Sequence, residues 1–492
     1  MPVETLISPE ARARYETVIG LEVHVQLLTQ SKIFCACSTR FGARPNSNTC
    51  PVCLGLPGAL PVLNRDAVTM AIKAALGLNC TVNPVSRFAR KNYFYPDLPK
   101  GYQISQYDQP LAEHGWLEIE VDGLRKQIGV TRVHLEEDAG KSLHEGFPDS
   151  DRESYIDLNR SGVPLIEIVS EPDLRSPEEA YAYLTQLRTV MLYLEVSDCN
   201  MEEGSLRCDA NVSVRPRGTE KFGTKTEVKN VNSFRFIQRA LAYEIDRQIE
   251  IVERGGHVQQ ETRLWDSREQ RTYGMRSKEH AHDYRYFPEP DLTPLVVPDA
   301  WLEEVRRALP ELPQPKEDRF VREYRLPKQD AALLATSRAQ AAYFEETARL
   351  CGEPKAAANW ILNDLPFALE QHGKAFADFP VPAANLAELI TLITKGTITG
   401  KIGKDVLGEM VASGKTAPAI IAEGGLAQIS DPEKIAQAAR EVIAANPRQV
   451  EQYRSGKTAT LGWFVGQVMK ATRGQANAQV VQEVLKRELG AP

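Results

Sequence analysis

Short stretches in which apolar and polar residues alternate cover the chain from about residue 15 to about residue 286. In residues 17–27 and 116–121, for example, every second side chain is apolar. A period of two is typical of strands that turn one face to a core. Longer stretches with the spacing of helices lie at 66–76, 176–194 and 233–254. This part of the chain is therefore expected to fold as an α+β domain.

A dense run of prolines separates this domain from the rest of the chain. Seven prolines fall between residues 287 and 316, and proline restricts the residue before it and lacks the amide proton of regular structure. Beyond them the pattern is helical, with a basic, glycine-containing break at 395–404. We predict three domains on these grounds, over residues 1–293, 294–409 and 410–492, of which the last two are helical.

Composition narrows the class of protein further. The 492 residues are 42% hydrophobic and 25% charged, which suits a globular protein with more than one core. No stretch is long and apolar enough to span a bilayer, and the first twenty residues lack the apolar core of a signal peptide, so a cytoplasmic protein is expected. The net charge of -7 argues against a whole-surface polyanion binder but leaves room for a basic surface on one domain.

Four cysteines near the start of the chain are spaced like zinc ligands. Cys35 and Cys37 form one close pair, Cys50 and Cys53 form a second, and the connector between them is rich in turn-forming Gly, Pro and Asn. The connector can therefore fold back and bring the four sulfurs around one tetrahedral ion. Four thiolates leave no open position for a substrate, so such a site is structural. The alternative is four buried or paired cysteines, and the spacing favours zinc.

Acidic residues inside strand-like stretches are the second chemical feature. The period of two puts Glu22 and His24 on one face of the stretch at 17–27, opposite the apolar residues. Four further strand-like or apolar stretches each hold a carboxylate, at Glu137, Glu167, Asp209 and Glu227. A buried carboxylate costs several kcal/mol unless it is paired, hydrogen-bonded or bound to a metal. If the strands bring these groups to one sheet face, they offer oxygen ligands for Mg²⁺, with the imidazole as an additional ligand.

Salt bridges are an equally simple explanation of these acids. The basic residues near them in the sequence are Arg132, Arg207, Lys225 and Lys229. Spacing alone does not decide between ion pairs and metal ligands. The end of a phosphate-binding loop is suggested by Gly140 and Lys141, but Leu135 stands where its first glycine belongs. Any ATP bound here must therefore be held by a metal and carboxylates.

These features occur together in one known family. The chain resembles the B subunits of the aspartyl/glutamyl-tRNA(Asn/Gln) amidotransferases over nearly its whole length. The motifs that carry the resemblance are Ile-Gly-Leu-Glu-Val-His at 19–24, Cys-Pro-Val-Cys-Leu-Gly at 50–55, Leu-Glu-Glu-Asp-Ala-Gly-Lys at 135–141, the stretch 157–168, and Gly-Gln-Val-Met-Lys at 466–470. Their joint occurrence in this order is far more specific than any one of them.

The resemblance implies a fold: a cradle-shaped α+β catalytic domain related to the glutamine synthetase fold and carrying the zinc site, then a helical domain and a small helical YqeY-like tail domain. It also implies a ligase that forms a carbon–nitrogen bond with glutamine as amido donor. ATP would phosphorylate the side-chain carboxylate of Glu-tRNA(Gln) or Asp-tRNA(Asn), and ammonia would then displace phosphate. An acyl phosphate is attacked readily where a carboxylate is not, and Mg²⁺ neutralises the phosphates during transfer.

The resemblance further implies partners and roles. An amidase-like A subunit would supply ammonia and a small C subunit would bridge the two. The metal and nucleotide candidates are Glu22, His24, Glu137, Glu167, Asp209 and Glu227. Glu136 and Asp138 are alternatives to Glu137, because all three could be ligands. The candidates for holding phosphate oxygens as fixed cations are Lys141, Arg160 and Lys229, with an ordinary surface lysine as the alternative for Lys229.

The tail combines aromatic residues with basic ones. Its basic residues are Lys401, Lys404, Lys415, Arg448, Arg454, Lys457, Lys470 and Arg473. Positive charge can follow a phosphate backbone, and the resemblance predicts that the tail binds misacylated tRNA by its shape. Composition alone predicts solvated lysines, and core positions for Trp463 and Phe464.

Two other functions are compatible with these residues. A zinc-anchored RNA-binding protein would use its acids only in salt bridges, so that Glu22→Gln or Asp209→Asn would leave its activity intact. A free-standing amino-acid ligase would need no basic tail.

Overall fold

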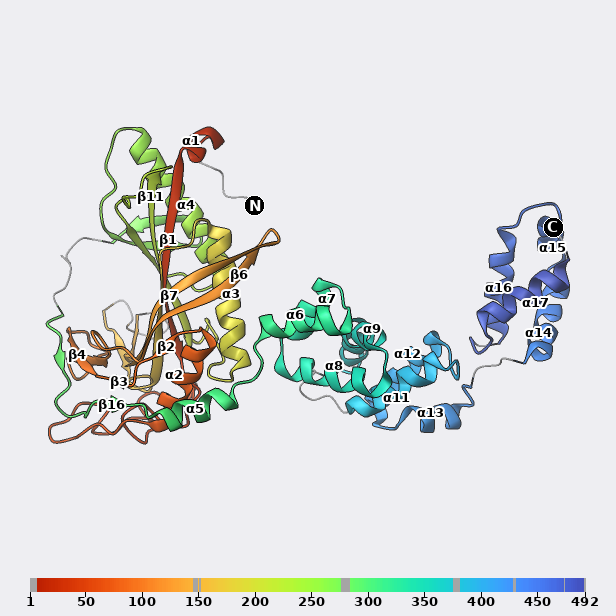
Figure 1. The fold of residues 1–492 in the computed structure, drawn as a ribbon, viewed down its shortest axis with the longest axis horizontal. Coiled ribbons are helices and arrows are strands. Elements are labelled where there is room, and N and C mark those ends of the chain that lie inside the picture. The colour runs from red at the N-terminus through yellow and green to blue at the C-terminus, as the bar shows by residue number, and fades with distance from the viewer. Residues whose placement is uncertain are drawn as a thin grey trace. The chain divides into compact units, whose positions relative to one another are not determined.

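The chain folds into two compact units, Met1–Leu312 and Pro313–Pro492 (Figure 1). The structure is a computed structural model that describes residues 7–490 apart from 145–148, 150–151, 276–283, 375–380, 428–430 and 473. The predicted division at 293 and 409 differs from the division into two units, and it stays a prediction about domains. The content of the units is as expected: the first is α+β and the second is helical.

A sheet of 12 strands, counted over the described residues, forms the centre of the first unit. Its main path runs β14-β13-β12-β11-β1-β10-β7-β5-β4-β15, and β6 pairs with β7 and β2 beside this path. The pairs are antiparallel except β12 with β13. The strands of this sheet are β1 (Tyr15–Gln26), β2 (Thr81–Val82), β4 (Ala89–Asn92), β5 (Tyr102–Ser105), β6 (Ala112–Val121), β7 (Leu124–Glu137), β10 (Pro164–Ser170), β11 (Leu206–Pro216), β12 (Thr226–Lys229), β13 (Thr262–Asp266), β14 (Arg271–Gly274) and β15 (Phe287–Pro288). Two small sheets pair β3 (Val85–Ser86) with β16 (Leu295–Val296) and β8 (Lys141–Leu143) with β9 (Tyr155–Asp157).

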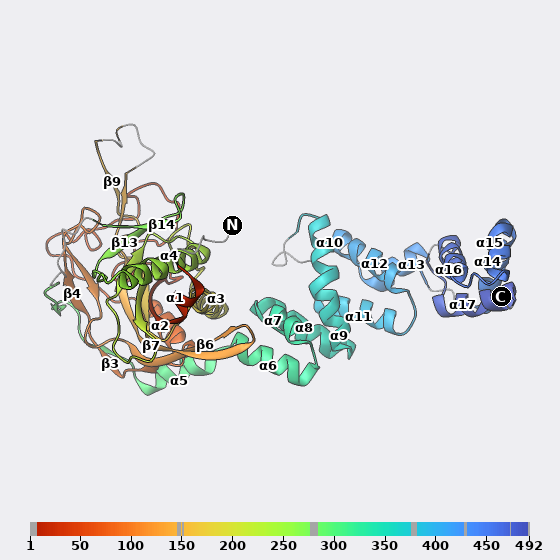
Figure 2. The same cartoon turned by 90° about the horizontal axis from the view of Figure 1, so that it is seen from above.

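Helices cover one face of this sheet (Figures 1 and 2). Those packed on the sheet are α2 (Arg65–Gly77), α3 (Pro177–Tyr193) and α4 (Phe234–Glu253), whereas α5 (Asp299–Ala308) packs against α2 and α1 (Pro9–Ala13) against α4. The predicted helices are α2, α3 and α4, and each begins after a side chain that accepts hydrogen bonds from its first turn: Asn64, Ser176 and Ser233. Their apolar residues share one core with Val23 and Val25 of β1. The alternate residues of β1 are therefore left on the opposite face, which we call the site face.

Most of the proline-rich stretch, up to Leu312, belongs to the first unit. Its strands β15 and β16 pair with β4 and β3, and α5 buries Val305 in the first core. Edge strands and first turns of helices tolerate proline because they can do without an amide hydrogen bond. The first unit thus extends to Leu312, and its boundary with the second unit falls inside the predicted stretch, whose last two prolines, Pro313 and Pro315, lie in α6 (Pro313–Tyr324).

The second unit has two separate helical cores. The first core contains side chains from Phe320 to Ile421, and the second from Ile435 to Leu489. The helices are α6 (Pro313–Tyr324), α7 (Lys328–Ala335), α8 (Arg338–Cys351), α9 (Pro354–Asn359), the π-helical turn η1 (Trp360–Asp364), α10 (Leu365–Gln371), α11 (Ala383–Thr394), α12 (Gly400–Ser413), α13 (Ala417–Gly424), α14 (Pro432–Ala445), α15 (Pro447–Arg454), α16 (Thr460–Ala471) and α17 (Ala478–Leu489). Within the ranges that the structure describes, no helix has the length and apolar character needed to cross a membrane.

Candidate active site

Strand pairing brings the acidic stretches side by side. On β1, Glu22 lies opposite Asp209 of β11, and His24 lies opposite Glu167 of β10. Glu167 in turn lies opposite His134 of β7. Residues that pair directly across strands turn their side chains to the same face. These side chains therefore form a row across four strands of the site face.

Three groups of this row are close enough to share one metal ion. Nε2 of His24 lies 3.3 Å from Oε2 of Glu167 and 3.7 Å from Oε1 of Glu136 on β7. One ligand atom from each of the three lies within 4.8 Å of the others. Both carboxylates are buried, with relative exposures of 3% for Glu136 and 9% for Glu167. Carboxylate oxygens and an imidazole nitrogen suit Mn²⁺ or Mg²⁺, and we call this set the acid–imidazole cluster.

Mutual charges set the protonation of this cluster. Burial alone would lower the pKa of His24, but the hydrogen bond to Glu167 and the charges of Glu136 and Glu167 raise it above its usual value. Burial would raise the pKa of Glu167, yet the charge of His134 and the hydrogen bond with His24 hold it well below its usual range. His24 is therefore drawn to the imidazolium form. In the metal-free protein, the positive charge of this imidazolium partly balances the charges of the two carboxylates. A bound divalent ion would take over that role.

The other end of the row contains an ion-paired lysine. Nζ of Lys229 on β12 lies 3.1 Å from Oδ2 of Asp209 and 3.3 Å from Oε1 of Glu227. Glu22 accepts a hydrogen bond of 3.2 Å from Nδ2 of Asn211, and burial, together with the neighbouring acids, raises its pKa. The salt-bridge interpretation thus applies to Asp209 and Glu227. Glu22 has no ion pair among the described residues.

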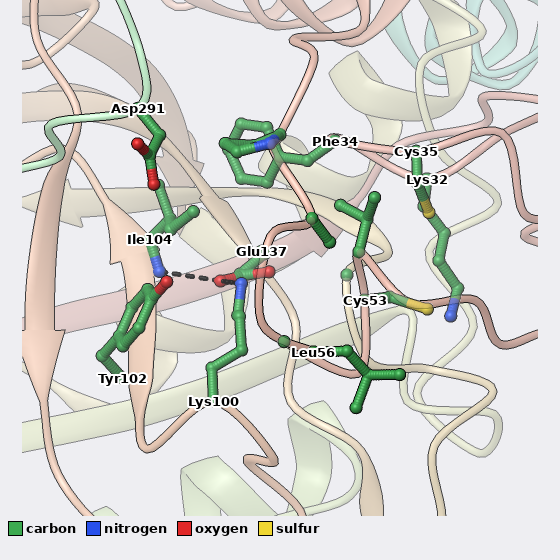
Figure 3. A pocket seen from close by; sticks show the side chains of 15 residues that line it. Lys32, Phe34, Cys35, Cys53, Leu56, Lys100, Tyr102, Ile104, Glu137 and Asp291 are labelled. Carbon is green, nitrogen blue, oxygen red and sulfur yellow. Dashed lines mark hydrogen bonds and ion pairs between the residues drawn. The ribbon is translucent and has the colours of Figure 1, made fainter.

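Glu137 does not join the row, and the expectation that it shares a face with the other acids is wrong. It follows Glu136 on β7, so it points to the opposite face. There its carboxylate forms an ion pair with Lys100 and accepts a hydrogen bond of 2.9 Å from the amide of Ile104. Figure 3 shows this pair beside a cavity of about 100 Å³. From the sequence alone, Glu136, Glu137 or Asp138 could be the ligand. The strand register places Glu136 on the site face.

Asp138, the third of these acids, holds the ends of strands together. It is buried and accepts hydrogen bonds from Nε2 of Gln26 at 2.6 Å and from the guanidinium of Arg207 at 2.9 Å. Burial alone would raise its pKa, but the charges of Arg207 and Arg160 bring the pKa below its usual value. Asp138 is therefore a buried carboxylate whose charge is compensated by arginines.

The phosphate candidates Arg160 and Lys141 line a separate hollow of about 160 Å³. Arg160 donates to the backbone carbonyls of Ala139 at 2.9 Å and Gly140 at 2.6 Å. Nζ of Lys141 lies over an aromatic ring, 4.9 Å from its centre. Gln26, two residues after His24 on β1 and on the same face, also lines this hollow. In the described structure neither cation is paired with a member of the acid–imidazole cluster.

The four cysteines meet as the sequence predicts. One sulfur each from Cys35, Cys37, Cys50 and Cys53 lies within 4.8 Å of the others, and all four are free of disulfides. The sulfurs of Cys50 and Cys53 are 3.9 Å apart. A tetrahedral zinc site with bonds of about 2.3 Å has edges of about 3.8 Å. The arrangement therefore fits zinc, and we call it the thiol cluster.

The surroundings of the thiol cluster favour the thiolate at Cys53 but not at Cys37. Hydrogen bonding with Cys35 and the charge of Lys32 help to lower the pKa of Cys53 to about 4, whereas burial raises the pKa of Cys37 to about 11. Lys32 is fully buried, and its Nζ donates a hydrogen bond of 2.7 Å to the carbonyl of Asn48. The ammonium of Lys32 is thus held beside the thiol cluster, whose thiols differ widely in pKa.

His134 is the member of the row that the sequence interpretation did not select. Its Nε2 lies 3.6 Å from Oε2 of Glu167 and 3.8 Å from Oε2 of Glu136. The alternation of β7 contained the signal, because residues two apart on a strand share a face. That spacing links His134 to Glu136 and separates both from Glu137.

The tail places its two adjacent aromatic residues differently. Phe464 is buried in the last core, whereas Trp463 has a relative exposure of 38%. Nζ of Lys415 is paired with Glu423 at 2.7 Å, and Arg473 lies outside the described residues. Binding of tRNA by the tail stays a prediction.

Comparisons with known proteins identify the family of this chain. Residues 17–303 match the family model of the GatB/GatE catalytic domain, and residues 342–489 match the model of the GatB domain. The chain is similar to three curated proteins, each named as the B subunit of an aspartyl/glutamyl-tRNA(Asn/Gln) amidotransferase. The protein from Carboxydothermus hydrogenoformans is 57% identical over 475 residues, covering 96% of this chain and 99% of the relative. Those from Geotalea uraniireducens and Moorella thermoacetica are 56% and 58% identical, covering 97% and 96% of this chain and 99% and 100% of the relatives.

Proposed function

The chain belongs to the family of aspartyl/glutamyl-tRNA(Asn/Gln) amidotransferase B subunits, and from that premise we propose that its first unit phosphorylates an aminoacyl side chain with ATP. The acceptor is the carboxylate of Glu-tRNA(Gln) or Asp-tRNA(Asn). Ammonia then displaces phosphate and leaves the amide of Gln-tRNA(Gln) or Asn-tRNA(Asn). The chain is thus the subunit that forms the carbon–nitrogen bond, with glutamine as the source of nitrogen.

The acid–imidazole cluster is the observation that carries this proposal. Its three ligand atoms lie within 4.8 Å of one another on the site face. His24, Glu136 and Glu167 would hold Mg²⁺, with Glu22 as a further ligand. When bound, the ion neutralises phosphate oxygens and so reduces the repulsion of an anionic acceptor. The burial of both carboxylates keeps water from competing with them for the ion.

A hollow of about 300 Å³ next to Glu22 supports the binding of a nucleotide. Its walls are mainly apolar and include Val18, Val169 and Phe222, with Ser213 among the polar residues. A nucleotide base is held by apolar and aromatic contacts with a few polar groups that fix its orientation. We place the adenine of ATP in this hollow, so that its phosphates extend toward the acid–imidazole cluster.

Three cations are proposed to bind the phosphates. Lys229 lies nearest the row and would exchange one of its carboxylate partners for a phosphate oxygen. Arg160 and Lys141 face the hollow at the other end of β1 and would bind a phosphate only if it reaches Gln26. Removal of Lys229 is therefore expected to affect ATP binding most.

The remaining roles follow from membership of the family. The thiol cluster would hold a structural zinc within a cradle related to the glutamine synthetase fold. An amidase-like A subunit would release ammonia from glutamine, and a small C subunit would bridge the two. The YqeY-like tail would bind the misacylated tRNA.

The test is amidation by the reconstituted complex of the three subunits with ammonia, ATP and Mg²⁺. We expect Glu-tRNA(Gln), Asp-tRNA(Asn) or both to be amidated, with release of phosphate that depends on the misacylated tRNA. Glu136→Gln should slow both readouts about 100- to 1000-fold. The matched control is Glu120→Gln, which removes an acid paired with Arg125 at 3.5 Å on the hairpin of β6 and β7. Absence of amide and of tRNA-dependent phosphate in the wild-type complex would reject the proposal.

A further inference from the structure

One lysine and four tyrosines lie next to the acid–imidazole cluster. Nζ of Lys91 on β4 lies 4.9 Å from the ring centre of Tyr284 and 5.8 Å from that of Tyr93. Tyr286 stacks on Tyr107 with ring centres 3.9 Å apart, and its ring meets that of Tyr284 edge-on at 6.0 Å. We call these four tyrosines the tyrosine wall. The functions assigned above leave both the lysine and the wall without a role.

Strand register places Lys91 on the site face. Lys91 lies opposite Gln103 of β5, and Ser105, two residues further on β5, lies opposite Glu136 of β7. The four side chains therefore share one face. The wall is electrostatically close to the acids, since the charge of Glu136 adds to the effect of burial in raising the pKa of Tyr286.

Lys91 differs from the other cations of these strands because it has no ion pair among the described residues. Lys229, Arg207 and Arg132 lie 3.1, 2.9 and 3.5 Å from a carboxylate oxygen, respectively. Aromatic ring faces stabilise an ammonium and leave its charge in place. The charge of Lys91 is therefore available to an anionic ligand.

The geometry of phosphoryl transfer indicates which anion binds there. The attacking and leaving oxygens lie roughly in line, on opposite sides of the transferred phosphorus. The hollow proposed for adenine borders β1, β10 and β11, and the acid–imidazole cluster spans β1, β10 and β7. In the strand order, β5 and then β4 with Lys91 follow β7. With the nucleotide on one side of the cluster, the acceptor must approach from the side of Lys91.

We propose that Lys91, supported by the tyrosine wall, binds the side-chain carboxylate of the aminoacyl group on tRNA. This assignment rests on the phosphorylation proposed above. One carboxylate oxygen pairs with the ammonium, and the other attacks the γ-phosphorus of ATP. As that bond forms, the bond from phosphorus to the ADP oxygen breaks and leaves its electron pair on ADP. No proton moves, and Lys91 keeps its charge.

The variant Lys91→Met in the reconstituted complex tests this site. We expect the KM for misacylated tRNA to rise about 10- to 100-fold, the loss associated with one hydrogen bond to a charged group. The KM for ATP should stay unchanged. Lys91→Arg keeps the positive charge and should restore much of the affinity for misacylated tRNA. The matched control is Lys73→Met on α2, which covers the opposite face of the sheet and should behave as the wild type.

Two substitutions of Tyr284 distinguish a contact between its ring and the ammonium of Lys91 from a general effect on protein stability. Tyr284→Phe keeps the ring beneath the ammonium and should leave the KM for misacylated tRNA unchanged. Tyr284→Leu removes the ring and should raise that KM about 3- to 5-fold, in line with one cation–π contact. If Lys91→Met fails to fold, as its melting curve would reveal, this pair tests the same site, and equal KM values for both would overturn the proposal.

Equilibrium binding distinguishes failure of this site from failure of the proposed reaction. The wild-type complex should bind Glu-tRNA(Gln) more tightly than deacylated tRNA(Gln), and Lys91→Met should remove this preference even if no amide forms. A KM increase for ATP alone would make Lys91 a phosphate ligand and overturn the proposal. Wild-type values for both substrates in Lys91→Met would overturn it too, whereas a wild-type complex that makes no amide would reject only the phosphorylation.

Discussion

The thiol cluster and the acid–imidazole cluster each offer the donor atoms of a metal site, but they are assembled differently. The thiols all lie between Cys35 and Cys53, in one stretch rich in turns. The acid–imidazole ligands come from β1, β7 and β10 and meet only through the strand register. The first cluster closes a local segment, and the second depends on the whole sheet.

This difference in assembly corresponds to a difference in chemistry. Four sulfurs satisfy a tetrahedral ion completely, whereas two carboxylates and an imidazole leave positions open for phosphate and water. Loss of a thiol should therefore affect folding first. Loss of an acid should affect catalysis and leave the fold intact.

The largest effect is expected from Cys53→Ser. The variant should lose its zinc, because three thiolates and a hydroxyl bind the ion far more weakly, and the energy of metal binding is part of the folding energy in such sites. We expect a lower melting temperature and faster proteolysis near residues 35–62, measured together with zinc content.

Cys351→Ser is the control for this experiment. Cys351 is half-buried in α8, far along the chain from the thiol cluster. Its substitution should leave zinc content unchanged. Full zinc content in Cys53→Ser would contradict the assignment of the thiol cluster.

A smaller effect on stability but a large one on activity is expected from Glu136→Gln. Removal of one ligand charge should slow tRNA-dependent phosphate release about 100- to 1000-fold while the melting temperature stays close to that of the wild type. Glu137→Gln should leave the dependence of the rate on Mg²⁺ concentration unchanged, because its carboxylate faces away from the cluster. A stronger effect of Glu137→Gln on Mg²⁺ dependence would show that the register argument is wrong.

These two clusters also show how far the sequence can predict a site. The spacing of the cysteines in the sequence is sufficient to predict the thiol cluster, because its geometry is determined within one short segment. For the acids, the sequence identified the strands but not the face: Glu136 and Glu137 differ by one residue, and a shift of one residue moves a side chain across the sheet. His134 lies two residues before Glu136 on β7, so it becomes a candidate only once Glu136 is chosen over Glu137.

Tertiary pairing explains the other differences. Lys91 lies on β4, and the tyrosine wall comes from the residues just after β4 and β5 and from the segment before β15, which meet only when the proline-rich stretch packs along the edge of the sheet. Nothing in the local pattern near Tyr284 indicates this contact. The same pairing extends the first unit to Leu312. The helices, in contrast, were predictable from periodicity and capping residues.

A pH-dependent effect of intermediate size is expected for the acid–imidazole cluster. The raised pKa of His24 means that its charged form stabilises the metal-free protein below the unfolded value of about 6.5, and that this contribution is lost as the pH rises through the folded value. A metal ion needs the neutral imidazole. Below the folded pKa, Mn²⁺ affinity should therefore fall about tenfold per pH unit, with one proton released on binding.

Titration calorimetry in buffers of different ionisation enthalpy measures this proton. His24→Gln should abolish the proton release and weaken the binding of Mn²⁺. Binding that is independent of pH in the wild type would contradict the role of His24 as a ligand.

The smallest effect is expected from Lys229→Met. Lys229 is paired with Asp209 and Glu227 at the outer end of the row, so its loss removes a cation without removing a ligand. We expect the KM for ATP to rise about tenfold, corresponding to one charge-assisted contact, with the KM for misacylated tRNA unchanged. An unchanged KM for ATP, with a lower melting temperature, would make this group a structural ion pair.

The position of a divalent ion tests the central claim most directly. Crystals of the complex with a non-hydrolysable ATP analogue and Mn²⁺ would reveal the ion by its anomalous scattering. We expect a peak about 2 Å from Nε2 of His24 and from carboxylate oxygens of Glu136 and Glu167. A peak beside Glu137 instead, or an empty acid–imidazole cluster in a complex that is active with Mn²⁺, would contradict the account.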